Sequence, residues 1–349
     1  MIEDMVLILE EDIKELSKAE LSQICKDLGI ASTGSISTLK GRILQYRRKE
    51  LEWEPLQNNF QFKQRNRIYA EHGPKGIAKE ATPLEIFSKF FSESQVSLLA
   101  EELSRISKPK GTSDLLIDKY LVYGFFALII ETSFNQSKKL INYHGTNNNA
   151  FFNSSGITQN AWRTLVSCLW KLSDGFFEPL EIDLNDAFIQ NYTPRRDVAI
   201  DETVRRFKGH WGSKVYAPDK PAKFGIKYYC MVDKSGYLLW FRLHRATPEI
   251  EEENKTLKLC KEAVDHLVNS NKNFTFHLFV DNYYGSLPLA EYVLSKNWDL
   301  TLALKANRVD TSSLITSLKD TILPTAAGPF NVRVNLDNTL AIGAWKDKG

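Results

Sequence analysis

The sequence has few cysteines, no long apolar run and no large excess of charge, and each shortage excludes a class of protein. Its four cysteines lie far apart and form no Cys-x-x-Cys pair, so a disulfide framework or a zinc ribbon is not expected. The chain is therefore interpreted as intracellular and reduced. The longest apolar stretch, residues 120–130, has 11 residues, whereas a membrane span needs about 20, so no membrane partner is expected.

Glycine (18 residues) and proline (12 residues) are not enriched, which excludes collagen-like and low-complexity chains. The acidic start of the sequence lacks the basic residues of a secretory signal, so secretion is not expected. The mean hydropathy of −0.31 and the hydrophobic fraction of 43% are typical of a globular chain. A length of 349 residues favours two or three domains.

Residues 1–50 are predicted to form a small helical hairpin. Ser17 and Glu20 have the spacing of a capping box, and Gly29 is placed to end this first helix. Apolar residues recur at helical spacing in both segments: Leu21, Ile24, Cys25 and Leu28 in the first, and Ile36, Leu39 and Ile43 in the second.

This hairpin resembles a SAP-type DNA-binding motif over residues 14–46. The resemblance rests on Leu16, Leu21, Leu28-Gly29-Ile30, Thr33-Gly34, Leu39 and Arg42-Ile43. It implies binding to double-stranded DNA, often AT-rich, with the start of the second helix, Lys40 and Arg42 facing phosphates. The alternative is a helical hairpin that mediates only protein contacts.

Residues 51–80 are interpreted as a linker, and residues 81–194 as an all-helical support or dimerisation domain, so a homodimer is one expected partner. Thr82 and Pro83 are typical of a helix start, and further helices are predicted over 115–131 and 158–172. The helix that begins at Thr82 and Pro83 has an apolar stripe of Leu84, Phe87, Phe90 and Phe91.

From Asp197 onward the apolar period becomes that of strands, and residues 195–349 are predicted to form an RNase H-like domain of mixed α/β (α+β) class. Strands are predicted at 197–201, 225–232, 237–243, 274–280 and 300–304, with helices at 251–270 and 286–295. The resulting order, βββαβαβ, is a three-stranded meander followed by α/β crossovers.

Two carboxylates are placed to act together. Asp201 ends the first predicted strand and Asp281 ends the fourth, and these two strands are neighbours in a sheet of this order. Paired acids on adjacent strand ends suit two divalent ions, so Asp201 and Asp281 are the predicted catalytic residues and metal ligands. The alternative is that each aspartate merely caps a turn.

Two blocks of sequence around these acids resemble the piggyBac transposase family. The first comprises Ile200-Asp201-Glu202, Phe207-Lys208-Gly209-His210 and the stretch from Tyr216 to Lys227; the second runs from Val280 to Leu289 and is followed by Lys305-Ala306-Asn307-Arg308. The resemblance spans about residues 82–349. It implies a recombinase with three catalytic aspartates and two Mg²⁺ ions that cuts DNA and joins a 3′-hydroxyl to target DNA, and it implies a nuclear location.

The third acid of that family lies in a Gly-Gly-Val-Asp block, and this sequence contains no Gly-Gly pair. The chain is therefore expected to stop short of the third acid, to bind Mg²⁺ weakly and to cleave DNA near background. A domesticated DNA- or chromatin-binding protein without catalysis is the alternative. If another acid completes the site, the candidates are Asp310, Asp320, Asp337 and Asp347.

The segment from Arg195 to Lys227 carries nine basic and four acidic residues, with Trp211, Tyr216 and Phe224 among them. Such a segment can neutralise phosphates, and its rings can stack on unpaired bases. The predicted nucleic-acid-binding residues here are Arg205, Arg206, Lys208, Lys214, Lys220, Lys223, Lys227 and Trp211. The alternative is a solvated basic loop whose aromatic rings face the core.

Overall fold

The computed structural model describes residues 16–27, 31–50, 53–55, 67–107, 115–134, 157–207, 209, 211–218, 220, 223–245, 252–305, 330–335 and 339–345. The chain forms two compact units, one of residues 1–70, 195–201 and 247–349, and one of residues 71–194 and 202–246. Within the described segments, no helix combines the length and the apolar character needed to cross a bilayer.

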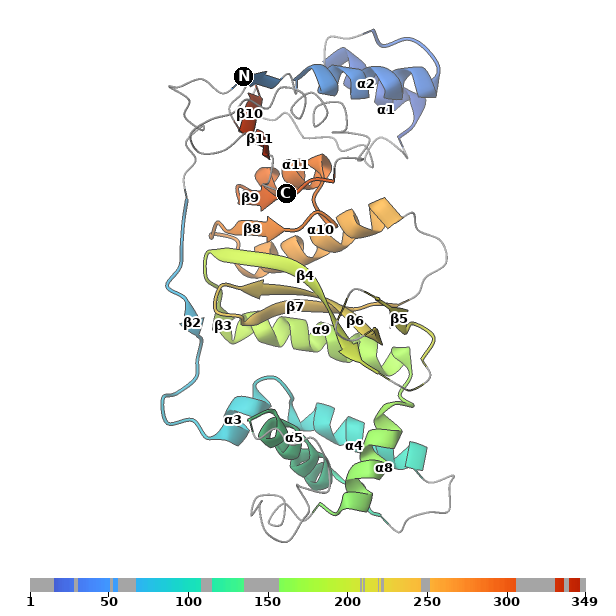
Figure 1. Cartoon of the computed structure of the whole chain (residues 1–349), viewed down its shortest axis with the longest axis vertical. Helices are drawn as coiled ribbons and strands as arrows, with labels where there is room; N and C mark the ends of the chain where they lie inside the picture. The colour runs from blue at the N-terminus through green and yellow to red at the C-terminus, as the bar shows by residue number, and fades with distance from the viewer. Residues whose placement is uncertain are drawn as a thin grey trace. The chain divides into compact units, whose positions relative to one another are not determined.

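In the first unit, α1 (Lys18–Asp27) and α2 (Ile36–Glu50) form the predicted helical hairpin (Figure 1). The capping box is confirmed: the Ser17 amide donates to Glu20 at 2.7 Å, and the Glu20 amide donates to the Ser17 hydroxyl at 3.4 Å. Ile36 was expected on the apolar stripe but is 46% exposed, because it stands at the very start of α2. The small shared core consists of Leu21, Cys25, Leu39 and Ile43.

A three-stranded antiparallel sheet in the same unit joins segments far apart in the sequence. Its strands are β1 (Trp53–Pro55), β10 (Phe330–Asn335) and β11 (Ala341–Trp345), with β10 in the middle. Further along, the Ile68 amide donates to the Thr275 hydroxyl at 3.0 Å. Residues 53–55 and Ile68, which lie within the predicted linker, thus make long-range contacts.

The central sheet is mixed and has the strand order β5-β6-β4-β8-β9, with β7 paired to β6. Strand β4 is parallel to β8, which is parallel to β9, whereas β6 is antiparallel to both β5 and β7. The predicted βββαβαβ order is confirmed, with the two-residue β5 as an addition. The strands are β4 (Asp197–Arg206), β5 (Val215–Tyr216), β6 (Phe224–Asp233), β7 (Leu238–Leu243), β8 (His277–Val280) and β9 (Asp299–Leu302).

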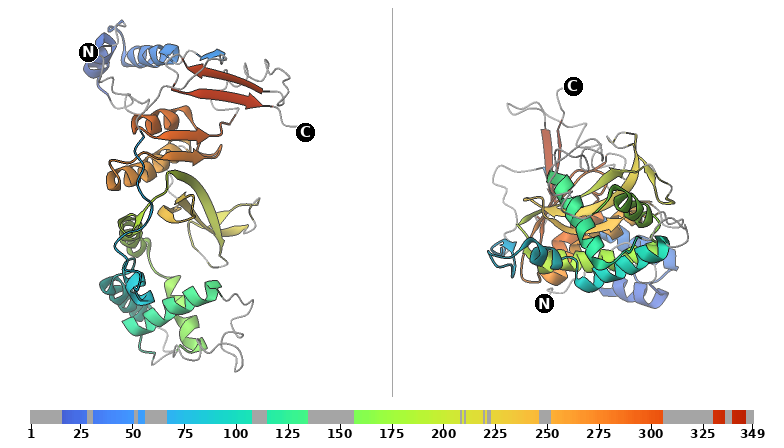
Figure 2. Two further views of the ribbon diagram at one scale, coloured as in Figure 1. Left: turned by 90° about the vertical axis from the view of Figure 1, so that its left-hand side faces the viewer. Right: turned by 90° about the horizontal axis from the view of Figure 1, so that it is seen from below.

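One face of β4 and β8 is buried. The alternating side chains Val198, Ile200, Leu278 and Val280 are at most 8% exposed. The helices α10 (Glu252–Ser270) and α11 (Leu287–Ser295) lie on one side of β8 and β9 (Figure 2). The apolar stripe of α10 faces the core, because Leu257, Cys260, Val264 and Leu267 are all buried.

The second unit carries the helices. They are α3 (Pro83–Ser88), α4 (Glu93–Ser107), α5 (Lys119–Phe134), α8 (Gln159–Leu169) and α9 (Asp174–Gln190). The Thr82 cap and Pro83 are confirmed as the start of α3. Leu84 was expected in the core but is 57% exposed, because α3 is short and buries only part of its surface. Helix α9, which packs along β7, was not predicted, and the short strands β2 (Gly73–Pro74) and β3 (Tyr192–Thr193) pair beside it.

Candidate metal and nucleic-acid site

The two predicted acids lie at one point on the sheet. In the parallel pairing of β4 and β8, Ile200 stands opposite Val280, and Asp201 and Asp281 are the next residue on each chain. Neighbouring strands are about 5 Å apart, so the two side chains are close neighbours. Both residues are exposed, which leaves their carboxylates accessible.

The turn after β8 fixes the position of Asp281. Its carboxylate accepts a hydrogen bond from the Tyr283 amide at 2.9 Å, and its carbonyl accepts one from the Gly285 amide at 2.9 Å. A Cβ atom at Gly285 would lie 1.9 Å from the Ala303 carbonyl oxygen, so only glycine fits where this turn meets the chain after β9. Ser286 then caps α11 by accepting from the Leu289 amide at 3.3 Å.

Successive side chains of a strand point to opposite faces of the sheet, so the acids lie on the exposed face, opposite the buried one. They stand at one end of that face. Next along this face lie Ala199, Phe279 and Thr301, which are paired across β4, β8 and β9. The opposite end of these strands is held by Arg67, whose guanidinium bonds the Asp299 carboxylate. Burial pushes the pKa of Asp299 upward, but the bonded Arg67 outweighs it and holds the pKa below its usual value.

Two adjacent surface carboxylates are oxygen ligands of the kind Mg²⁺ takes, so Asp201 and Asp281 fit part of a divalent-metal site. Over the described part of the chain, no three acids, histidines or cysteines lie close enough together to share one ion. The four candidate third acids, Asp310, Asp320, Asp337 and Asp347, lie outside the described residues.

The basic residues of the segment that follows Asp201 lie in different environments. Arg205, Arg206 and Lys223 are exposed. Lys214 donates to the Gly209 carbonyl at 3.0 Å, and Lys220 pairs with Glu202 at 3.3 Å.

Lys227, the last of these predicted contacts, stands over the Tyr229 ring with its ammonium 4.9 Å from the ring centroid. Lys208 lies outside the described residues. The exposed cations are thus concentrated on the end of β4 and the start of β6.

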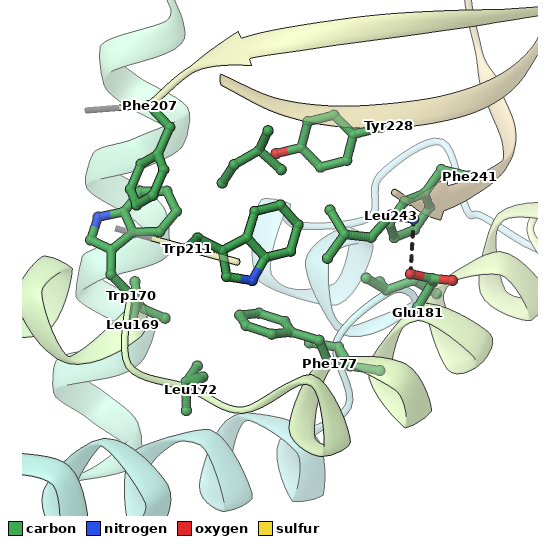
Figure 3. Close-up of a pocket in the computed structure, with 13 residues that line it drawn as sticks. Leu169, Trp170, Leu172, Phe177, Glu181, Phe207, Trp211, Tyr228, Phe241 and Leu243 are labelled. Atoms are coloured by element: carbon green, nitrogen blue, oxygen red, sulfur yellow. Dashed lines mark hydrogen bonds between the residues drawn. The ribbon is translucent and has the colours of Figure 1, made fainter. Parts of the chain in front are cut away.

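Trp211 points into a cavity of about 270 Å³ in the second unit (Figure 3). Aromatic and leucine side chains from α8, α9, β6 and β7 surround it, and the Trp170 and Phe207 rings contact at 4.3 Å between centroids. The acid in the wall, Glu181, accepts from the Leu243 amide at 3.0 Å and from Arg245 at 3.2 Å. This position matches the alternative in which aromatic rings of the basic segment face inward.

A family model described as Transposase IS4 matches residues 82–349. The chain belongs to this transposase family. Among curated relatives, human PiggyBac transposable element-derived protein 2 is 22% identical over 298 residues, which are 77% of this chain and 47% of the relative. Human PiggyBac transposable element-derived protein 3 is 21% identical over 172 residues, 48% of this chain and 28% of that protein. The chain therefore spans at most about half the length of these relatives.

A solved structure agrees with this membership in the transposase family. The cryo-EM structure of the piggyBac transposase synaptic complex with hairpin DNA aligns with a TM-score of 0.54 and 21% identity, and it covers 76% of this chain and 60% of that one. The likeness shows a transposase-type, RNase H-like fold. Together with the relatives, it makes the chain piggyBac transposase-like.

The N-terminal hairpin lies outside the match to the transposase family model. Within the hairpin, Arg42 donates to the carbonyls of Ala31 and Thr33 and so braces the loop between α1 and α2. Lys40 is half-buried on α2. Their assignment as phosphate contacts remains a prediction.

Sequence reasoning did not find the cavity or the residues outside the basic segment that line it. Trp170 is the C-cap residue that follows α8, and Glu181 and Phe177 belong to α9, a helix that was not predicted. No periodic pattern connects these residues to Phe207 and Trp211. Only the folded chain brings them together.

Proposed function

We propose that the chain is a DNA-binding protein of piggyBac type whose Asp201 and Asp281 hold a divalent metal ion for phosphoryl transfer. The observation that carries this proposal is the parallel register of Ile200 with Val280, which sets the two acids side by side. The basic residues that follow Asp201 on the same strand support a DNA partner. So does the solved relative, whose structure contains hairpin DNA.

When bound, Mg²⁺ would supply Lewis-acid stabilisation of the attacking and leaving oxygens at a phosphodiester. In that reaction a water oxygen bonds to phosphorus, the bond from phosphorus to the 3′-oxygen breaks, and the leaving oxygen takes a proton. Asp201 and Asp281 would orient the ion through their carboxylates. The exposed side chains of Arg205 and Arg206, a few residues along β4 from Asp201, would hold the phosphates of the strand.

Two carboxylates complete only part of an octahedral coordination shell. We therefore expect weak metal binding and strand cleavage near background. The second candidate function, a DNA-binding protein without catalysis, is favoured by the lack of a third acid near the pair among the described residues. Either function on chromosomal DNA would place the chain in the nucleus.

A nicking assay with Mg²⁺ or Mn²⁺ on a terminal-repeat DNA substrate separates these two functions. Background cleavage by the wild type, with DNA binding retained, supports the non-catalytic protein. Robust cleavage that disappears in Asp201→Asn supports the catalyst, and it would assign the missing ligand to one of the acids outside the described residues. The matched control is Asp183→Asn, a carboxylate on α9 in the second unit.

The SAP-like hairpin is proposed as a second DNA contact. Its exposed helix start presents the Ser35 hydroxyl, which accepts from the Thr38 amide at 3.2 Å. Deletion of residues 1–50 should weaken duplex affinity. Unchanged affinity would favour the alternative that this hairpin mediates only protein contacts.

A homodimer is proposed through α5. This helix is apolar on nearly all sides, and Tyr120, Tyr123, Ala127, Ile130 and Phe134 recur at the three- and four-residue spacing of a helix-pairing seam. Three of them are exposed although they are large: Tyr120 by 71%, Ile130 by 47% and Phe134 by 79%. Tyr123 also packs against Phe87 of its own chain, whereas the exposed members of the stripe would be covered by the same stripe of a second copy.

A further inference from the structure

The basic segment divides its aromatic side chains between an inner and an outer surface. Phe207 and Trp211 face the cavity, and Phe207 is only 8% exposed. Tyr216 and Phe224, in contrast, are 61% and 54% exposed. Sequence alone placed all of these rings in one segment, whereas the structure leaves more than half of Tyr216 and of Phe224 exposed.

Tyr216 and Phe224 form one aromatic surface. They stand opposite each other in the β5–β6 pairing, with ring centroids 4.7 Å apart and planes inclined at 35°. A cross-strand aromatic pair stabilises a hairpin by about 0.5–1.5 kcal/mol beyond its buried area. That role does not require more than half of each ring to remain exposed, so a second role is expected.

The backbone of the neighbouring strand β4 holds this aromatic surface in place. The Phe207 amide donates to the Phe224 carbonyl at 3.2 Å. At Gly225 a Cβ atom would lie 2.2 Å from the Arg205 carbonyl oxygen, so glycine allows the two strands to approach this closely. The exposed Arg205 and Arg206 are thereby placed beside the aromatic pair.

Exposed cations flank the aromatic pair along the chain and on the adjoining strand. Lys223, which is exposed, directly precedes Phe224, and Arg205 and Arg206 come from the adjoining strand. Glu202, the acid that precedes these arginines on β4, is already paired with Lys220. Planar rings among cations suit a polyanion that carries planar groups of its own.

We propose that the β5–β6 hairpin binds unpaired DNA, with bases stacked on Tyr216 and Phe224 and phosphates held by Lys223, Arg205 and Arg206. Bases within a duplex are stacked on one another and offer no face to these rings, so the surface selects single-stranded segments. This inference rests on the proposed function in DNA binding and narrows it to a kind of DNA.

The test compares the binding of labelled oligo-dT and of a duplex to the full chain by fluorescence anisotropy. Stacking is worth about 1–3 kcal/mol per base, so Tyr216→Ala/Phe224→Ala should weaken oligo-dT binding roughly 10- to 100-fold and leave duplex affinity within about twofold. The ring-preserving variant Tyr216→Phe/Phe224→Tyr should bind like the wild type. Tyr69→Ala removes an exposed ring from the other unit and should also have no effect.

If the double alanine variant binds oligo-dT as tightly as the wild type does, the inference is overturned. The proposed function in DNA binding still stands in that case, provided that the wild type binds the duplex. Failure of the wild type to bind either DNA overturns both. Ring-dependent binding of a tyrosine-containing poly-glutamate peptide as tightly as oligo-dT would assign the surface to a protein instead. If circular dichroism shows that the double variant does not fold, Phe224→Trp replaces it. Oligo-dT should then quench the tryptophan fluorescence of this variant more than that of the wild type. Equal quenching of the two proteins would overturn the stacking inference.

Discussion

Ile200 lies opposite Val280 in the parallel pairing of β4 and β8, although 80 positions separate them in the sequence. Both side chains are buried beneath the sheet, so hydrophobic packing fixes the register of the two strands. The residues that follow them, Asp201 and Asp281, must then emerge side by side on the other face. A slip of one residue would turn the buried side chains outward and separate the acids.

Gly285→Ala should destabilise the fold by roughly 1–3 kcal/mol, because the added methyl would collide with the Ala303 carbonyl at 1.9 Å. The measurement is urea unfolding followed by circular dichroism. Gly212→Ala is the matched control, since a Cβ atom there meets nothing within 4 Å. Equal stability of the two variants would contradict the close approach.

The pairing of Arg67 with Asp299 should make stability depend on pH. The pKa of Asp299 is lowered in the folded state, so its contribution is present above the unfolded pKa of about 3.9 and is lost as pH falls through the folded value. Asp299→Asn should therefore lower the free energy of unfolding by about 1–3 kcal/mol near pH 7. That deficit should shrink near pH 3. A deficit that stays constant across this range would show that the charge is not its cause.

Neutralising Arg205, Arg206 and Lys208 together should weaken duplex binding and flatten its salt dependence. For every phosphate that the protein no longer neutralises, the slope of log K against log salt becomes shallower by about one. Asp201→Asn should leave duplex affinity at low salt almost unchanged, because metal binding and phosphate binding are separate. The check is a salt titration of duplex binding by the wild type, the triple variant and Asp201→Asn. An unaltered slope in the triple variant would place the DNA-binding surface elsewhere.

Dimer formation should depend on the exposed stripe of α5. Tyr120→Glu/Phe134→Glu should shift the chain to monomer in light-scattering chromatography, since charges would be buried at the seam. Leu98→Glu is the control: it changes a similarly exposed side chain on α4, outside the stripe, and should leave the dimer intact. A wild type that is monomeric at high concentration would remove the basis of this proposal.

The sequence predicted the central sheet and its acids because the information there is local. Alternating apolar residues reveal strands such as β4 and β8, and the order of the elements along the chain determines which strands are neighbours. Asp201 and Asp281 could be chosen because each follows directly on such a strand. The capping boxes at Ser17 and Thr82 likewise depend on residues three positions apart.

Features that depend on distant contacts were not predicted. Strand β1 is three residues long and gains its partner, β10, almost 280 positions later. Helix α9 contains Pro179, and a proline inside a helix is unfavourable by about 3 kcal/mol, so local propensity argues against a helix that its packing on β7 supports. The direction of Trp211 is set by a cavity whose walls come from four separate elements.

The central claim is that Asp201 and Asp281 form one divalent-metal site, and iron-mediated cleavage of the protein backbone tests it most directly. Fe²⁺ bound in place of Mg²⁺, with ascorbate and peroxide, generates radicals that cut the chain near the ion. The account predicts cuts close to both residue 201 and residue 281, competed by Mg²⁺ and abolished together in either Asp201→Asn or Asp281→Asn. Cuts at only one of these positions, or a pattern that survives both substitutions, would contradict it.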